Sequence, residues 1–159
     1  MADTRTKDQR SRIMRSVGTL DTGPELTVRR LLHRLGYRYT LHRRDLPGRP
    51  DIVFPGRRKA IFIHGCFWHG HDCGKGRLPK SRTEYWTAKI KANRDRDAKV
   101  VAHLKDACWQ TLAVWQCELK NLDAVDRVLR EFLGPAGSGS QKSPYAAGRR
   151  RSESTSSRK

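Results

Sequence analysis

The chain has few acidic residues and lacks any long apolar segment. Asp and Glu number 16 against 34 Lys and Arg, so the formal net charge is +18 at pH 7. This imbalance predicts a polyanionic partner but names no reaction, because ribosomal and histone-like proteins are basic too. No apolar run approaches the roughly 20 residues of a membrane span, and the polar start lacks a signal-peptide pattern. We therefore expect a cytoplasmic protein with no membrane association.

Cysteine is also scarce, with four among 159 residues. In a chain without an export signal, four thiols predict reduced cysteines or a metal site rather than disulfides. The length suits one domain with a real core, which we place at residues 21–133. Residues 1–20 form a basic N-terminal arm, in which Ile13, Met14 and Val17 allow only a short helix. Residues 134–159 are rich in Gly, Ser, Pro and Arg, which predicts a disordered basic tail.

The apolar spacing of residues 21–133 predicts alternating helices and short strands. A capping-box pattern with Pro in the first turn begins at Thr22, and apolar residues follow at helical spacing until Gly36. On a second helix, Val101, Leu104 and Cys108 share one face, so we interpret Cys108 as a buried thiol. The predicted strands cover 37–41, 51–54, 59–64 and 109–115, and the later helices cover 83–107 and 123–133.

The strands over 51–54 and 59–64 form a predicted hairpin. With the turn centred between Arg57 and Arg58, Asp51 lies opposite His64, and directly opposed residues point to the same face. A two-residue shift would place Phe62 opposite Asp51 and keep His64 on that face, whereas a one-residue shift would reverse the relation. The favoured register brings a carboxylate and an imidazole together. A solvent-exposed Asp–His pair at a strand end is the alternative.

Residues 61–73 contain three of the six histidines and two of the four cysteines. Cys66, His71 and Cys73 suit zinc, because thiolate sulfur and imidazole nitrogen match a borderline-soft cation. A fourth ligand is missing locally, and Cys117 is the best remaining candidate. The spacing is not that of a zinc finger. The alternative is a set of reduced, buried thiols beside a surface histidine.

These motifs resemble a known nuclease family. Pro50-Asp51 followed by a hairpin strand resembles the core of PD-(D/E)XK nucleases, although the usual acidic-x-Lys positions read Phe62-Ile63-His64. Gly65-Cys-Phe-Trp-His69 and His71-Asp-Cys73 complete a close resemblance to the very-short-patch-repair (Vsr) DNA mismatch endonucleases. The resemblance extends over residues 5–133.

The resemblance implies an α/β fold of the restriction-endonuclease type, with a mixed central sheet flanked by helices and a structural zinc site. It also implies an endodeoxyribonuclease that needs Mg²⁺ and nicks duplex DNA 5′ of the thymine in a T:G mismatch. Such mismatches arise when 5-methylcytosine deaminates, and the nick initiates very short patch repair. Residues 1–20 would then be a DNA-binding arm and residues 21–133 the endonuclease domain.

Roles for individual residues are also implied by the resemblance. Mg²⁺ would be held by the carboxylate of Asp51 and the backbone carbonyl of Ile63, where relatives often have Thr. His69 would be the catalytic imidazole. The groups supporting water and metal would be His64, Glu25 and Asp97, and zinc would be held by Cys66, His71, Cys73 and Cys117. The side chains entering the DNA would be Phe67, Trp68 and Trp86 from the major groove and Met14 from the minor groove.

Several residues also have a purely structural interpretation. Glu25 is explained as a helix cap, Asp97 as an exposed carboxylate paired with Arg94 or Arg96, and the aromatic residues as core. The competing function is a non-catalytic zinc-containing DNA- or RNA-binding protein. The implied partners are duplex DNA with a T:G mismatch, a MutL-type mismatch-repair protein and a functionally linked cytosine-5 methyltransferase. We expect a nucleoid-associated monomer.

Overall fold

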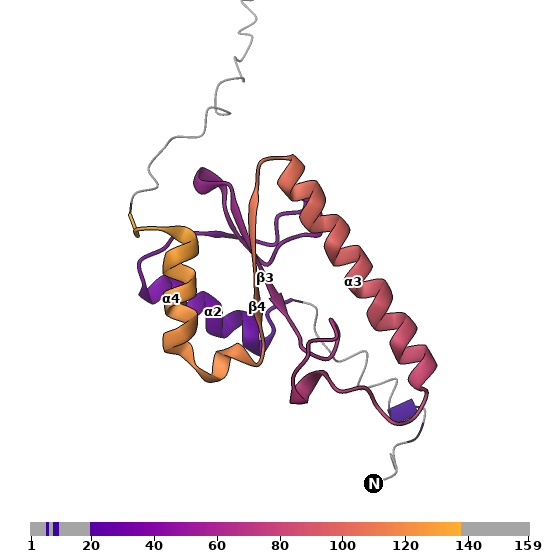
Figure 1. The fold of residues 1–159 in the computed structure, drawn as a ribbon. Helices are drawn as coiled ribbons and strands as arrows, with labels where there is room; N and C mark the ends of the chain where they lie inside the picture. The colour runs from indigo at the N-terminus through magenta and orange to yellow at the C-terminus, as the bar shows by residue number, and fades with distance from the viewer. Residues whose placement is uncertain (1–5, 7, 10–19, 138–159) are drawn as a thin grey trace, which may run out of the picture.

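A computed structural model describes residues 6, 8–9 and 20–137 (Figure 1). Four strands form one sheet in the order β1-β2-β3-β4, with three longer helices packed around it. No helix in the described ranges is long and apolar enough to cross a membrane. The elements are α2 (Gly23–Arg34), β1 (Thr40–Leu41), β2 (Ile52–Phe54), β3 (Lys59–His64), α3 (Thr83–Asp106), β4 (Gln110–Trp115) and α4 (Leu122–Leu133).

The sheet is mixed, as expected. Strands β1, β2 and β3 are antiparallel neighbours, whereas β3 and β4 run parallel over six register pairs from Lys59↔Gln110 to His64↔Trp115. Parallel strands need a long crossover, and α3 supplies it. Figure 1 shows α3 on one side of β3 and β4, with α2 and α4 on the other. The prediction of a mixed sheet flanked by helices is therefore confirmed.

The main core lies between the sheet and the pair α2 and α4. Helical spacing places the apolar residues of each helix on one face, which packs against one face of the strands. Side chains alternate along β3, so Ile61 enters this core while Phe62 and His64 point to the opposite face. The cluster comprises Val28, Leu31, Leu32, Tyr37, Ile52, Phe54, Ile61, Val114, Val125, Leu129 and Leu133. The face left for His64 is the one that α3 covers.

The favoured hairpin register is wrong by two residues. The observed pairs are Ile52↔Ile61 and Phe54↔Lys59, which put Asp51 opposite Phe62. The reason is the turn: Pro55–Arg57 forms a short 3-10 helix and Arg58 takes a left-handed conformation with φ 51°. The turn centre therefore falls one residue earlier than expected. Since the shift is even, His64 stays on the same face as Asp51.

The interpretation of Cys108 as a buried thiol is also wrong. Helix α3 ends at Asp106, and Cys108 is exposed in a left-handed conformation with φ 61°. Only Leu104 of the predicted stripe is buried, whereas Val101 is 43% exposed. The stripe stops here because Trp109 N–H donates to the Leu104 carbonyl and turns the chain into β4.

One predicted strand is shorter than expected. The strand predicted over 37–41 is reduced to Thr40–Leu41, because Tyr37 is buried in the core, where its hydroxyl donates to the Gly134 carbonyl. The short helix expected around Met14 lies outside the described residues, as does the chain beyond 137.

Candidate active site

Asp51 is fixed at the start of the β2–β3 hairpin. Its backbone carbonyl accepts a hydrogen bond from His42 N–H at 3.3 Å, and its carboxylate Oδ2 accepts one from Ile63 N–H at 2.7 Å. Burial raises the pKa of the Asp51 carboxyl, while the Ile63 N–H acts in the opposite direction. The hairpin thus holds a partly desolvated carboxylate directly against the backbone of residue 63. These two groups are the ones expected to share a metal ion.

His69 is oriented by a carboxylate from α3. Its Nδ1 lies 2.5 Å from Asp97 Oδ2. An ionised carboxylate can only accept, so Nδ1 carries the proton and Nε2 is left for proton transfer. The His69 ring stacks on His64 with centroids 4.0 Å apart and planes 2° apart. Burial, followed by the charge of His69, lowers the pKa of His64 to about 4, so His64 is neutral at physiological pH.

One turn of α3 positions the loop that carries His69. Asn93 Nδ2 donates to the Trp68 carbonyl at 2.8 Å, and Asp97, four residues later, contacts His69. Residues at i and i+4 share a helix face, so both contacts come from the face directed at the loop. Arg96 also lies 3.6 Å from Asp97. The ion pair expected for an exposed carboxylate therefore coexists with the contact to His69.

A second pair, Glu25 and His42, lies beside Asp51. Thr22 Oγ1 caps α2 by accepting from Glu25 N–H, but the Glu25 carboxylate is almost fully buried and points elsewhere. Its Oε1 lies 3.0 Å from His42 Nε2 and 3.2 Å from an Arg29 nitrogen. Although the two atoms are close, neither ring nitrogen of His42 is aligned for a hydrogen bond. Glu25 is thus more than a helix cap.

His42 was missed by the sequence analysis. The available signal was its position directly after a short strand that can pair with the strand following Asp51. The pairs Thr40↔Val53 and Leu41↔Ile52 make His42 the next residue along, opposite Asp51. Its backbone is left-handed, with φ 47°, which turns the chain away from the sheet at the site.

The expected zinc ligands converge in the structure. One donor atom from each of Cys66, His71, Cys73 and Cys117 lies within 4.8 Å of the others. Zinc–sulfur bonds of about 2.3 Å in a tetrahedron separate the ligands by roughly 3.8 Å, so the donor set and its size fit zinc. The close approach of these groups shifts the pKa values of two of the thiols. The hydrogen bond from His71 lowers the pKa of Cys73 to about 6, whereas burial and the neighbouring thiols raise that of Cys117 to about 11.

Parallel pairing explains why Cys117 belongs to this cluster. His64 pairs with Trp115 at the ends of β3 and β4. Cys66 and Cys117 each lie two residues beyond that pair, so they leave the sheet side by side. The Trp115 ring also stacks on His71, with centroids 4.2 Å apart.

The three expected aromatic residues gather at the start of α3. Phe67 lies 5.2 Å from Trp68 and 5.1 Å from Trp86, measured between ring centroids in edge-to-face arrangements. Each is half-buried and none belongs to the buried core cluster. Their interpretation as core residues therefore does not fit. Met14, expected on the opposite side of the DNA, lies outside the described residues.

Comparison with known proteins decides the family. Residues 2–75 match the family described as DNA mismatch endonuclease Vsr. The chain is 40% identical over 134 residues to DNA mismatch endonuclease Vsr of Escherichia coli K12, covering 84% of this chain and 86% of that protein. It is 52% identical over 136 residues to Type II nicking enzyme V.XorIIP of Xanthomonas oryzae pv. oryzae, covering 86% of this chain and 100% of that protein. The chain belongs to the Vsr family of DNA mismatch endonucleases.

Gly70, next to His69, has a structural role in the loop. Gly70 has φ +60°, and a Cβ there would lie 2.5 Å from Ile90 Cγ2 of α3. Only glycine lets the loop turn this closely against the helix. In this Vsr-family chain, Gly70 therefore sets the distance between His69 and α3.

Proposed function

We propose that this chain is an endodeoxyribonuclease that requires Mg²⁺ and nicks duplex DNA 5′ of the thymine in T:G mismatches formed by 5-methylcytosine deamination. In that role it would initiate very short patch repair. The observation that carries the proposal is the His69–Asp97 pair, stacked on His64, on the sheet face to which Asp51 also belongs. This arrangement places a proton-transfer group, His69, and a hard oxygen ligand, Asp51, on one face of the sheet. Metal-assisted phosphodiester hydrolysis requires both kinds of group.

Asp51 and Ile63 are the groups proposed to hold Mg²⁺. A carboxylate and a backbone carbonyl are oxygen donors of the kind Mg²⁺ prefers. Bound Mg²⁺ would stabilise negative charge on the phosphate and the leaving oxygen. The Ile63 N–H fixes the orientation of the Asp51 carboxylate. Because only the carbonyl of residue 63 is used, an apolar side chain is compatible with the role.

His69 is proposed to move the proton through Nε2. Asp97 holds Nδ1 and so fixes both the tautomer and the ring orientation. Neutral His64 supports the ring by stacking without adding positive charge. Glu25 lies at the Asp51 end of the site, where it is proposed to position water or metal. Zinc is proposed to be structural, because four protein ligands leave no open coordination position.

Recognition of T:G is proposed to use the aromatic cluster. A wobble pair stacks poorly, so opening the neighbouring step costs less than at a Watson–Crick pair. Rings of Phe67, Trp68 and Trp86 could replace the lost stacking at roughly 1–3 kcal/mol each. Trp68→Ala should then keep a nearly normal melting temperature but lose selective nicking at T:G. A large loss of stability with unchanged T:G selectivity per folded molecule would contradict the proposed insertion of the Trp68 ring into the DNA.

The deciding assay compares nicking of T:G and T:A duplexes by the wild type, Asp51→Asn and Asp45→Asn. Asp45 is an exposed carboxylate in the preceding loop, paired with Arg43, and serves as the matched control. Mg²⁺ should be omitted rather than chelated, since a chelator would also remove zinc. We expect T:G nicking only with Mg²⁺, its loss in Asp51→Asn with DNA binding retained, and full activity in Asp45→Asn.

The outcome also distinguishes the competing function. A non-catalytic zinc-containing DNA- or RNA-binding protein would bind duplexes equally well in all three forms and nick none of them. Full nicking activity of Asp51→Asn would contradict the proposed Mg²⁺ site at Asp51 and Ile63.

A further inference from the structure

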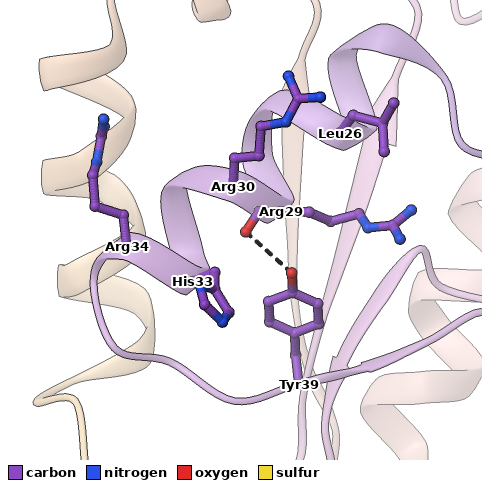
Figure 2. Close-up of a pocket in the computed structure, with 6 residues that line it drawn as sticks. All are labelled: Leu26, Arg29, Arg30, His33, Arg34 and Tyr39. Carbon is purple, nitrogen blue, oxygen red and sulfur yellow. Dashed lines mark hydrogen bonds between the residues drawn. The ribbon is translucent and has the colours of Figure 1, made fainter.

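Helix α2 carries a basic hollow that faces the segment leading into β1. The hollow measures about 340 Å³. Tyr39, the residue before β1, is part of its lining, and the Tyr39 hydroxyl donates to the Arg29 carbonyl of the helix at 3.1 Å. Figure 2 shows the arginine side chains spread along the helix around this bond. The lining residues are Leu26, Arg29, Arg30, His33, Arg34 and Tyr39.

The charge of this hollow is only partly compensated. Arg29 lies 2.5 Å from an Asp21 carboxylate oxygen and 3.2 Å from one of Glu25, so its charge is balanced. Within the described part of the chain, neither Arg30 nor Arg34 forms an ion pair. Both are exposed, one helical turn apart, with His33 between them. Two guanidinium groups thus present unpaired donors at the same hollow.

The helix dipole explains part of this pattern. His33 and Arg34 lie in the last turn of α2, where positive charge is favourable because the helix dipole is negative at that end. This effect is confined to the last turn, so it gives no reason for Arg30. It also gives no reason for a hollow. A ligand with several negative oxygens would explain the unpaired Arg30, the unpaired Arg34 and the hollow between them. Guanidinium groups bind phosphate through paired N–H donors.

We propose that Arg30, His33 and Arg34 form an additional phosphate-binding surface for the duplex DNA that the active site cuts. The inference rests on the proposed function, because DNA is the polyanion in question. The other end of α2 carries Glu25, which lies beside Asp51. From Glu25 to Arg34 the helix rises about 13.5 Å, which matches roughly four base-pair steps of 3.4 Å. A rigid helix therefore connects the active site to phosphates about four nucleotides away.

The test measures DNA affinity against salt for the full chain without Mg²⁺. The variant is Arg30→Gln/Arg34→Gln. The matched control, Arg127→Gln/Arg130→Gln, removes the same charge from α4, where both residues are exposed. Each phosphate contact contributes about −0.9 to the slope of log K against log salt. We expect the variant slope to be smaller by about 1.8. Between 50 and 200 mM salt the wild type should then lose roughly tenfold more affinity than the variant, and the control should match the wild type.

Two additional arms make the assignment specific. Phosphate contacts carry no sequence information, so the slope difference should be equal on T:G and T:A duplexes. A wild type that fails to nick T:G would remove the proposed function without affecting this measurement. Shortening the duplex to fewer than about four base pairs on one side of the mismatch should abolish the difference between wild type and variant.

Three results would overturn the proposal. One is an unchanged slope accompanied by a lower melting temperature, which would assign the charges to the helix dipole. Another is an unchanged slope with normal stability, which would leave an acidic protein surface as the better occupant. The third is an equal decrease of the salt-dependence slope in the α4 control, which would mean that only the total charge of the protein matters.

Discussion

At the scale of single residues, the site depends on contacts that fix one atom at a time. Asp97 holds Nδ1 of His69, and Ile63 N–H holds Oδ2 of Asp51. The first contact leaves Nε2 of His69 available for proton transfer, and the second leaves the other carboxylate oxygen of Asp51 available for a metal ion. The side chains are thus oriented before any substrate binds. Such preorganised groups need not rearrange during the reaction, which favours a fast chemical step.

The contact between Asp97 and His69 gives a prediction at this scale. Asp97→Asn should retain DNA affinity but lower the single-turnover rate of T:G nicking by about 10²–10⁴-fold, because an amide does not fix the imidazole tautomer or stabilise its charged form. Asp95→Asn is the control, since Asp95 is an exposed residue of the same helix paired with Lys91. A rate within twofold of wild type in Asp97→Asn would show that the contact has no catalytic role.

At the scale of elements, α3 and the loop over residues 65–76 define the site together. The loop lies against the helix through Gly70 and the bond from Asn93 to the Trp68 carbonyl. It contacts the segment that follows β4, because His71 Nδ1 lies 3.4 Å from Cys117 Sγ. Backbone hydrogen bonds within the loop, such as the one from His71 N–H to the Cys66 carbonyl at 2.9 Å, set its local shape. The attachments to α3 and to Cys117 set where the loop lies.

Gly70→Ala should lower the free energy of unfolding by about 1–3 kcal/mol, since it adds a positive-φ side chain and an overpacked contact with Ile90. Urea denaturation provides the measurement. Gly74→Ala is the matched control in the same loop, because a Cβ there meets nothing within 4 Å. Equal stability of the two variants would mean that the loop can move away from α3 without cost.

The proposed zinc site gives a second prediction for the loop. Cys117→Ser should reduce bound zinc, measured by elemental analysis, and lower the melting temperature, because the metal joins the loop to β4. Cys108→Ser should change neither quantity, since Cys108 is exposed and outside the cluster. Wild-type protein purified without zinc and equally stable with or without it would contradict the site.

At the scale of the whole molecule, positive charge is spread along the chain, including residues outside the described ranges. Residues 134–159 hold six basic residues and one acidic residue, and 1–133 are still strongly basic. The first residues after α4 nevertheless contact the domain. Arg57 donates to the carbonyls of Leu133 and Pro135, and Tyr37 donates to that of Gly134. A truncation that tests the tail should therefore begin after residue 137.

Removing residues 138–159 should weaken DNA binding and reduce its salt dependence by about 0.9 in slope for each phosphate that the tail neutralises. The ratio of nicking between T:G and T:A duplexes should not change, because Arg149, Arg150 and Arg151 would contact phosphates only. Truncation after Leu133 should in addition lower the melting temperature. Loss of T:G discrimination in the shorter deletion would refute this role for the tail.

The sequence by itself determined the features that depend on neighbouring residues. The cap and apolar stripe of α2, the strand over 59–64, the helix ending near Leu133 and three of the four clustered zinc-type ligands all follow from local spacing and side-chain chemistry. The motif around Asp51 and His69 was specific enough to predict the family, which the comparisons confirm.

Only the tertiary structure decided which distant segments meet. The left-handed Arg58 set the hairpin register, parallel pairing of β3 with β4 brought Cys117 to Cys66, and strand β1 placed His42 beside Glu25. It also left Cys108 exposed at a helix end. Local periodicity fixes which way a side chain points from its own element. Which partner it faces depends on how elements far apart in the chain pack, and that is set by the burial of the whole apolar surface.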